Sequence, residues 1–246
     1  VAIDTVSGGS ANESGTPQVV TITITENESA PTVTLTTSAT SIVENAGSSL
    51  TLTATLSVAT TADVTVSIDG TGGTATEGTD FGTVSDITIS AGATTGTAAV
   101  DPTDDSVYEG NETAGISISG VSGGGASESG SQSVTVTITE DESAPTVTLT
   151  VSATSITENA GTSLTLTATL SQVADEDVTV TIGTAGTSTE ATDYTDGSGN
   201  VDDITISAGS TTGTVNFTPT DDSVYEGNET AIISIDGVSG GGASES

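Results

Sequence analysis

The sequence predicts an all-β protein made of tandem immunoglobulin-like β-sandwich domains in a repeat array. Short segments in which Val, Ile or Leu alternate with Thr recur along the 246 residues, whereas no stretch of useful length has helical apolar spacing. The abundant Thr and Val residues are β-branched and favour strands. The segment SAPTVTLT occurs at 29–36 and again at 143–150, so the same unit is used more than once.

Each repeat is expected to hold about seven short antiparallel strands, separated by Gly, Ser, Asn and Asp. Each strand has a single apolar face, which predicts two sheets packed face to face. In the first repeat these strands are expected at 33–35, 50–56, 64–68, 87–89, 98–100, 116–118 and 134–138.

The boundaries of the repeats do not coincide with the first and last residues of the chain. Residues 29–142 form one complete repeat, 143–246 form a second that lacks its last strand, and 1–28 carry the C-terminal strands of a preceding one. Two explanations remain open. The chain is a window on a longer array, or residues 15–28 of one subunit supply the strand missing from 143–246 of the next, as in donor-strand complementation.

The charge balance is one-sided. The chain carries 34 Asp and Glu residues with no Lys, Arg or His, which gives a net charge of −34. Binding to nucleic-acid phosphates or anionic membranes is therefore excluded, and no run of about 20 apolar residues suggests membrane insertion. Cys, His and Lys are absent, so the chain lacks the side chains that most nucleophilic and acid–base catalysis uses, and an enzyme is not expected.

The acidic residues concentrate in the loops between predicted strands, and the run PTDDSVYEGNETA occurs at 102–114 and 219–231. So many hard oxygen donors suit Ca²⁺, which takes six to eight oxygen ligands, whereas Zn²⁺ would need His or Cys. The alternative is solvated loop charge or a halophilic surface. An outside cation is favoured because the acidic runs recur at fixed loop positions.

Four motifs occur in the same order in the first repeat, and three of them recur in the second. They are ENAG at 44–47 and 158–161, TDF at 79–81 with TDY at 192–194, DDSVYEGNE at 104–112 and 221–229, and TITEDE at 137–142. In this combination the chain resembles the Calx-beta domain, which is found in sodium–calcium exchangers and large bacterial surface proteins. The resemblance covers essentially all of 29–142.

The resemblance implies a set of Ca²⁺ ligands in each repeat. In the first they are Glu44, Asp80, Asp104, Asp105, Glu109 and Glu112, joined by the closing run Glu140, Asp141 and Glu142. In the second they are Glu158, Asp193, Asp221, Asp222, Glu226 and Glu229. The family's closing run is usually aspartate, and the second repeat has no closing run here. Its site is expected to be incomplete unless the chain continues or a neighbour supplies the run.

The expected function is structural: a Ca²⁺-binding repeat region of an extracellular fibre or adhesin stalk at the cell surface. Only Ser143 to Pro145 separate the closing run from the next strand, so bound Ca²⁺ is expected to stiffen the junction between domains. The expected partners are neighbouring copies of the repeat, in the same chain or head to tail. Two alternatives are a Ca²⁺-sensing regulatory module and a ligand-binding adhesin domain. The second includes ice binding by outward-facing Thr rows, although such rows are also ordinary in strands.

Overall fold

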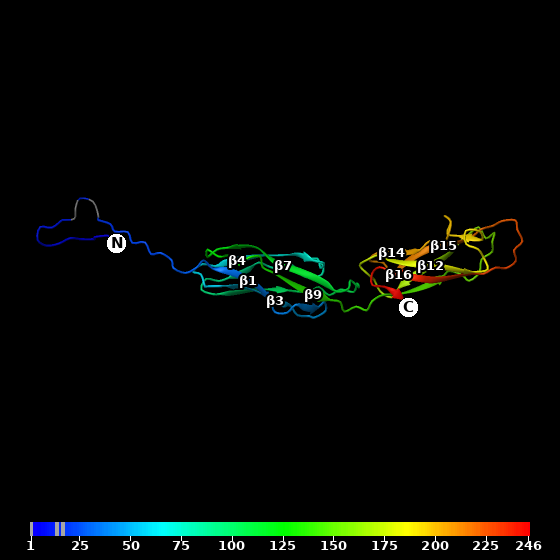
Figure 1. Ribbon diagram of the computed structural model, residues 1–246, viewed down its shortest axis with the longest axis horizontal. Coiled ribbons are helices and arrows are strands. Elements are labelled where there is room, and N and C mark those ends of the chain that lie inside the picture. Colours follow the sequence, from blue (N-terminus) through cyan, green and yellow to red (C-terminus); the bar gives the residue numbers. More distant parts are fainter. Residues whose placement is uncertain (1, 13–14, 16–17) are drawn as a thin grey trace.

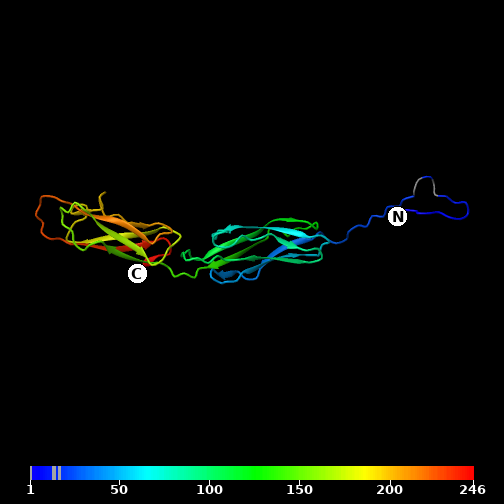
Figure 2. The same cartoon turned by 180° about the vertical axis from the view of Figure 1, so that it is seen from behind.

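A computed structural model describes residues 2–12, 15 and 18–246. Two β-sandwiches follow one another along the chain, and residues 18–28 lead into the first as a single trace (Figures 1 and 2). The predicted fold class, all-β with tandem sandwiches, is confirmed. Among the described residues, no helix has the length and apolar character that a membrane span requires.

The first sandwich contains two short strands besides the predicted ones. Its strands are β1 (Thr32–Thr37), β2 (Ser41–Val43), β3 (Leu50–Leu56), β4 (Val64–Gly73), β5 (Ile87–Ile89), β6 (Thr95–Val100), β7 (Glu112–Ser122), β8 (Ser127–Glu128) and β9 (Ser133–Thr139). One sheet has the order β6-β3-β1-β8 and the other the order β2-β9-β7-β4-β5. The unforeseen β2 and β8 each run parallel to a longer strand, β9 and β1 respectively, so they depend on contacts between distant segments.

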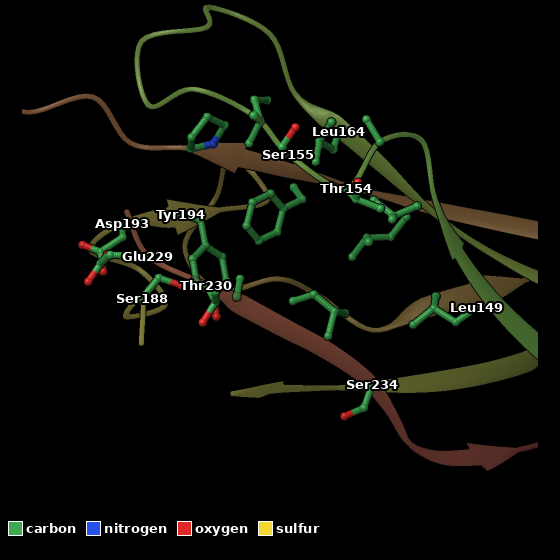
Figure 3. Close-up of a pocket in the computed structure, with 18 of the residues that line it drawn as sticks. Leu149, Thr154, Ser155, Leu164, Ser188, Asp193, Tyr194, Glu229, Thr230 and Ser234 are labelled. Carbon is green, nitrogen blue, oxygen red and sulfur yellow. The ribbon is translucent and has the colours of Figure 1, made fainter. Parts of the chain in front are cut away.

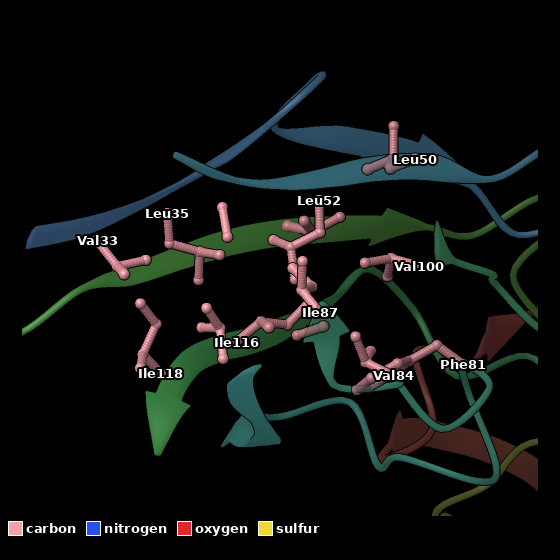
Figure 4. Close-up of a cluster of buried hydrophobic side chains, with 14 of the residues drawn as sticks. Val33, Leu35, Leu50, Leu52, Phe81, Val84, Ile87, Val100, Ile116 and Ile118 are labelled. Atoms are coloured by element: carbon pink, nitrogen blue, oxygen red, sulfur yellow. The ribbon is translucent and has the colours of Figure 1, made fainter. Parts of the chain in front are cut away.

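The core of the first sandwich lies between these two sheets. Side chains of β1 and β3, such as Val33 and Leu52, point toward those of β7, such as Ile116 (Figure 4). All three are fully buried. As predicted, the alternation of Thr with apolar residues places one face of each strand in the core and the other toward solvent.

The last strand, β9, closes the first sandwich. It pairs antiparallel with β7 in the register Glu112 with Ile138 and Ile116 with Val134, and parallel with β2. Its Val136 and Ile138 are buried. The strand therefore completes the core, and it also carries the chain to the junction with the second repeat.

The second sandwich repeats most of this plan within residues 146–245. Its strands are β10 (Thr146–Val151), β11 (Leu164–Leu170), β12 (Val178–Gly186), β13 (Tyr194–Thr195), β14 (Ile204–Ile206), β15 (Thr212–Pro219), β16 (Ala231–Ser239) and β17 (Ser244–Glu245). The sheets have the orders β13-β15-β11-β10-β17 and β14-β12-β16. Within 143–246, all of which the structure describes, β16 pairs along one edge only, with β12.

The second core is less completely buried than the first. Ile116 is fully buried, but its counterpart Ile233 is only half-buried. Residues 155–157, which correspond to β2, form no strand, because the partner on which β2 depends is absent from this sandwich.

The described part of 1–28 contains no strand. Ala2 and Val19 form one isolated antiparallel bridge, and Ile22 and Ile24 are 73 % and 94 % exposed. The backbone N–H of Ile3 donates to the carbonyl of Gln18 at 3.3 Å, but a single bridge does not make a stable sheet. The assignment of 1–28 to a preceding repeat stays a prediction.

Alanine substitutions at the equivalent positions Ile116 and Ile233 should have different effects on the stability of the two cores. Ile116→Ala should lower the stability of the first sandwich by about 2–5 kcal/mol, whereas Ile233→Ala should lower that of the second clearly less, because the Ile233 side chain is already partly exposed. Amide hydrogen exchange in β3 and β11 measures the two effects separately. Equal losses would mean that the second core is as tightly closed as the first.

Candidate metal centre

Acidic side chains from four separate segments meet at one end of the first sandwich. They come from the turn after β2, the segment before Phe81, the loop between β6 and β7 with the first residue of β7, and the run after β9. Because β9 ends where β7 begins, the closing run lands beside the loop that carries the repeated acidic motif. The carboxylates fall into two clusters.

The first cluster consists of Glu44, Glu140, Asp141 and Glu142, each of which has a carboxylate oxygen within 4.8 Å of the others. Glu44 is buried, with only 6 % of its surface exposed. One Glu44 oxygen accepts a hydrogen bond from the backbone N–H of Asp105 at 3.3 Å. The side chain of Asn45 donates to Asp141. The ENAG turn and the closing run are thus joined directly.

Glu140 ties the acidic loop to the closing run. Its Oε2 atom accepts hydrogen bonds from the backbone N–H groups of Glu109 at 2.6 Å and Gly110 at 2.7 Å. Its Oε1 atom accepts from the N–H groups of Asp141 and Glu142, both at 3.1 Å. The backbone of Glu140 in turn donates to Asn111 at 3.0 Å. A single carboxylate therefore sets the geometry of both segments.

The second cluster consists of Asp80, Glu109 and Glu112, again with oxygens within 4.8 Å of one another. Asp80 is held by the backbone N–H of Thr76, which donates to Oδ2 at 2.5 Å. Glu112 opens β7, so its position follows from the β7–β9 pairing. This cluster faces the second repeat, because Glu109 is adjacent to the residue that contacts it, Tyr108.

The crowding of these acids shows in their pKa values. Burial, then the neighbouring carboxylates, raises the pKa of Glu44 and of Glu109 to about 7. Burial, then a hydrogen bond with Asp80, raises the pKa of Glu112 to about 7. A hydrogen bond with Glu140, then burial, raises the pKa of Glu142 to about 7. Burial acts on the pKa of Glu140 in the same direction, but its hydrogen bonds outweigh burial and lower it.

The donor set fits a hard divalent cation. The first cluster offers only oxygen atoms, and four carboxylates hold enough of them for the six to eight that Ca²⁺ takes. Within the described part of the chain, Glu142 Oε2 is buried and has no hydrogen-bond partner. A buried carboxylate oxygen without a donor is costly unless a cation satisfies it. The residues present therefore suit Ca²⁺.

The second repeat assembles smaller and more exposed acidic groups. Glu158, Asp222 and Glu226 form one group, and Asp193, Glu226 and Glu229 form another, so Glu226 is shared. All except Asp193 are exposed. Glu158 accepts from the N–H of Asp222 at 3.1 Å, as Glu44 does from Asp105. The loop is thus formed alike in both repeats, but no closing run reaches it.

Not every expected ligand joins a cluster. In the part of the chain that the structure describes, Asp104, Asp105 and Asp221 belong to none of these groups. Asp105 Oδ1 instead accepts from the N–H of Val107 at 2.7 Å, which shapes the loop. The roles of these three residues as ligands stay predictions.

One residue beside the site was missed from the sequence. Asp175 lies in the second repeat, and its N–H donates to the carbonyl of Tyr108 at 3.3 Å. Burial, then Glu176 and more distantly Asp80 and Glu140, raises the pKa of Asp175. Its place in the first repeat is held by Thr61, so this difference between the repeats was the only available signal.

The family model of the Calx-beta domain matches residues 26–142 and 140–244. The chain belongs to the Calx-beta domain family. The two matches overlap at residues 140–142, the acidic run after β9, and together they cover most of the sequence. A search of curated proteins finds no match.

Solved Calx-beta domains are among the similar structures. The crystal structure of CBD12 from CALX1.2 is 22 % identical, with a TM-score of 0.39, and the match covers 76 % of this chain and 74 % of that one. The apo form of the Calx CBD1 domain is 21 % identical, with a TM-score of 0.39 and coverage of 45 % and 99 %. The calcium-binding domain CBD12 of CALX1.1 is 20 % identical, with a TM-score of 0.39 and coverage of 74 % and 74 %.

Without divalent cations, the chain should lose stability as pH rises. The pKa values of Glu44, Glu109, Glu112 and Glu142 are about 7 in the folded protein against 4.5 ordinarily, so the folded state holds more protons. Their contribution is complete below pH 4.5 and is lost as pH rises through about 7. Urea unfolding in EGTA across this range measures the effect. A stability that rises with pH would contradict it.

Two substitutions within the acidic motif should have unequal effects on metal binding. Glu112→Gln removes a charge from the second cluster and should weaken Ca²⁺ binding by the first repeat about tenfold or more. Asp104→Asn alters the same loop outside the clusters and should change the affinity little. Isothermal titration calorimetry measures both. Equal losses would make Asp104 a ligand, as the family resemblance implies.

Proposed function

We propose that this chain is a Ca²⁺-binding structural segment of an extracellular fibre or adhesin stalk, in which bound ions stiffen the junction between repeats. The observation that carries the proposal is the position of the acidic clusters. They lie at the end of the first repeat that meets the second, and the same loop that supplies Glu109 and Glu112 also supplies the contact with the next domain.

The contact between the repeats is made by Tyr108. Its backbone N–H donates to the carbonyl of Val173 at 2.9 Å, and its carbonyl accepts from Asp175. The tyrosine ring lies against Gly242, where a Cβ atom would come within 2.4 Å of Cε1. Tyr108 lies between Asp105 and Glu109 in the sequence. A cation that orders the acidic loop would therefore also order the contact between the two repeats.

A bound cation would act on both the loop and the linker. The first cluster joins the ENAG turn to Glu140–Glu142, and the linker begins immediately after this run. Like charges about 4 Å apart cost roughly 1 kcal/mol per pair even in water, so without a cation these carboxylates would repel one another. Ca²⁺ at 100 times its Kd would add about 2.7 kcal/mol per site. Extracellular modules commonly bind at about 0.1–1 mM.

The extracellular location and the partners belong to the same proposal. A site of carboxylates without any protein cation suits a medium in which Ca²⁺ is abundant. The partners proposed are other copies of the repeat, because the two repeats already meet through surfaces that each of them carries. The Calx-beta domain is a binding module, and no catalytic role is proposed.

Small-angle scattering and thermal unfolding test this function. With Ca²⁺ the two repeats should scatter as a stiff rod and the Tm should rise by several degrees, whereas with EGTA the maximum dimension should vary and the Tm should fall. A Ca²⁺ sensor would instead show well-separated affinities in the two repeats and a defined change of shape. If Ca²⁺ changes neither quantity, the stiffening role is wrong.

Two glycine substitutions should distinguish an effect on the junction between the repeats from an effect on the turn within a repeat. Gly242 and Gly125 occupy the same turn in the two repeats, with φ of +60° and +69°. Alanine strains both turns alike, but only at Gly242 does it also collide with Tyr108, since nothing lies within 4 Å at Gly125. In Ca²⁺, Gly242→Ala should therefore make the rod flexible by scattering, while Gly125→Ala should leave it stiff.

A further inference from the structure

The loop between β11 and β12, with which the second repeat contacts the first, is more acidic than its counterpart. It reads SQVADED at 171–177, whereas the equivalent loop of the first repeat reads SVATTAD at 57–63. Asp175 and Glu176 therefore stand where the first repeat has Thr61 and Ala62. The loop that meets the acidic end of the first repeat thus carries two additional negative charges.

Backbone contacts hold Asp175 beside the acidic loop of the first repeat. Tyr108 and Ala174 form a parallel β-bridge. The N–H of Asp175 donates to the carbonyl of Tyr108 at 3.3 Å, and Glu109 directly follows Tyr108 in the chain. The backbone of Asp175 is therefore one hydrogen bond away from the residue that precedes a member of the second cluster.

The carboxylate of Asp175 interacts with all three acids of the second cluster. Burial raises the pKa of Glu109 and of Glu112 most, and Asp175 is among the carboxylates that raise both pKa values further. After burial and Glu176, Asp80 contributes to the raised pKa of Asp175. This mutual repulsion costs free energy, and the chain has no Lys, Arg or His to relieve it. A cation placed between these carboxylates would turn the repulsion into attraction.

The second cluster alone is short of oxygen ligands. Each of its carboxylates, on Asp80, Glu109 and Glu112, has two oxygens. Asp80 Oδ2 already accepts from the N–H of Thr76. Because Ca²⁺ takes six to eight oxygens, three carboxylates reach the lower limit only if every one binds with both of its oxygens. A fourth carboxylate removes this demand.

One pair of carboxylates forms within each repeat, so Asp175 is added to it from outside. In the second repeat Asp193 and Glu229 lie together (Figure 3). Their counterparts in the first repeat, Asp80 and Glu112, are grouped in the same way. The pair therefore follows from the fold of a single repeat, whereas Asp175 reaches the second cluster only across the junction.

We propose that Asp175 joins Asp80, Glu109 and Glu112 around one Ca²⁺ ion, so that the ion binds both repeats at once. Among the described residues the Asp175 carboxylate stands outside this group of three, and its side chain is exposed. An exposed side chain changes rotamer readily, so it can turn toward a bound ion. This role of Asp175 rests on the function proposed above and names the residue through which the ion holds the second repeat.

A shared ion couples Ca²⁺ binding to the contact between the repeats. When the second repeat supplies a ligand, the first repeat binds Ca²⁺ more tightly, and Ca²⁺ strengthens the contact between the repeats by the same factor. Any change that releases Tyr108 from the second repeat therefore also lowers the affinity of the second cluster for Ca²⁺. A cluster whose ligands all came from one repeat would not respond in this way.

Asp175→Asn and Glu176→Gln provide a matched test in the full chain. Both remove one negative charge from the same exposed loop. Both are made together with Glu226→Gln, which removes the carboxylate that the two groups of the second repeat share, so that calorimetric titration with Ca²⁺ reports the first repeat. Asp175→Asn should weaken one binding step about tenfold, whereas Glu176→Gln should change it less than about twofold. The difference should persist in 1 M NaCl, which screens charges that do not touch the ion.

A double-mutant cycle tests whether Asp175 acts across the junction. Gly242→Ala collides with the ring of Tyr108, so in this background Asp175→Asn should cause no further loss of Ca²⁺ affinity. With Gly125→Ala, where nothing lies within 4 Å, the tenfold loss should remain.

The outcomes separate this role of Asp175 from the proposed function. Asp175 does not share the ion if Asp175→Asn binds Ca²⁺ as well as Glu176→Gln does, if the difference disappears in 1 M NaCl, or if the loss is undiminished with Gly242→Ala. Scattering of the unaltered chain in Ca²⁺ and in EGTA reports the stiffening by itself. A chain that stiffens while Asp175→Asn keeps its affinity rules out only the shared ion, and a chain that does not stiffen rules out the proposed function.

Discussion

The pairing of β7 with β9 is the interaction on which the first repeat depends most. It buries Val136 and Ile138, provides the edge on which β2 forms, and delivers Glu140, Asp141 and Glu142 to the side of Glu44. The second repeat shows what remains without it. The two sheets are present, but part of the core is less deeply buried, residues 155–157 form no strand, and the clustered acidic residues other than Asp193 are exposed.

A second constraint is electrostatic. Packing carboxylates at the end of β9 raises the pKa values of several of them, since burial and proximity both oppose their charge. With no Lys, Arg or His in the sequence, no side chain can relieve this repulsion. Under the proposed function, the same residues would hold the junction together in the presence of a cation and push it apart in its absence. The sandwiches themselves contain apolar cores that do not depend on a cation.

The main strands could be predicted from the sequence because their signal is local. Thr alternating with Val, Ile or Leu places one face in the core, and this requires no knowledge of the neighbouring strand. The short β2 and β8 could not be predicted in this way, since each exists only as the parallel partner of a distant segment. The turn and loop motifs indicated where the acids gather, because motif order in the chain fixes which loops share an end of the sandwich.

The sequence predicted less well which individual acidic residues belong to the clusters. Asp104 and Asp105 are close to the clusters in sequence, but neither belongs to one. The Asp105 carboxylate accepts from the N–H of Val107, whereas Glu109 and Glu112 group with Asp80. Asp175 comes close only because Tyr108 binds the backbone of the next repeat. Both facts depend on loop geometry, which no residue pattern in a single repeat specifies.

The direction of β9 has a mechanical consequence. The strand leads straight into the linker, so tension applied along the chain pulls β9 parallel to its own length. Its hydrogen bonds to β7 and β2 are then loaded in shear, and many of them must break together rather than one after another. Such a geometry resists extension far better than a strand peeled from one end. A tether built from this repeat would hold its length under flow until whole strands slip.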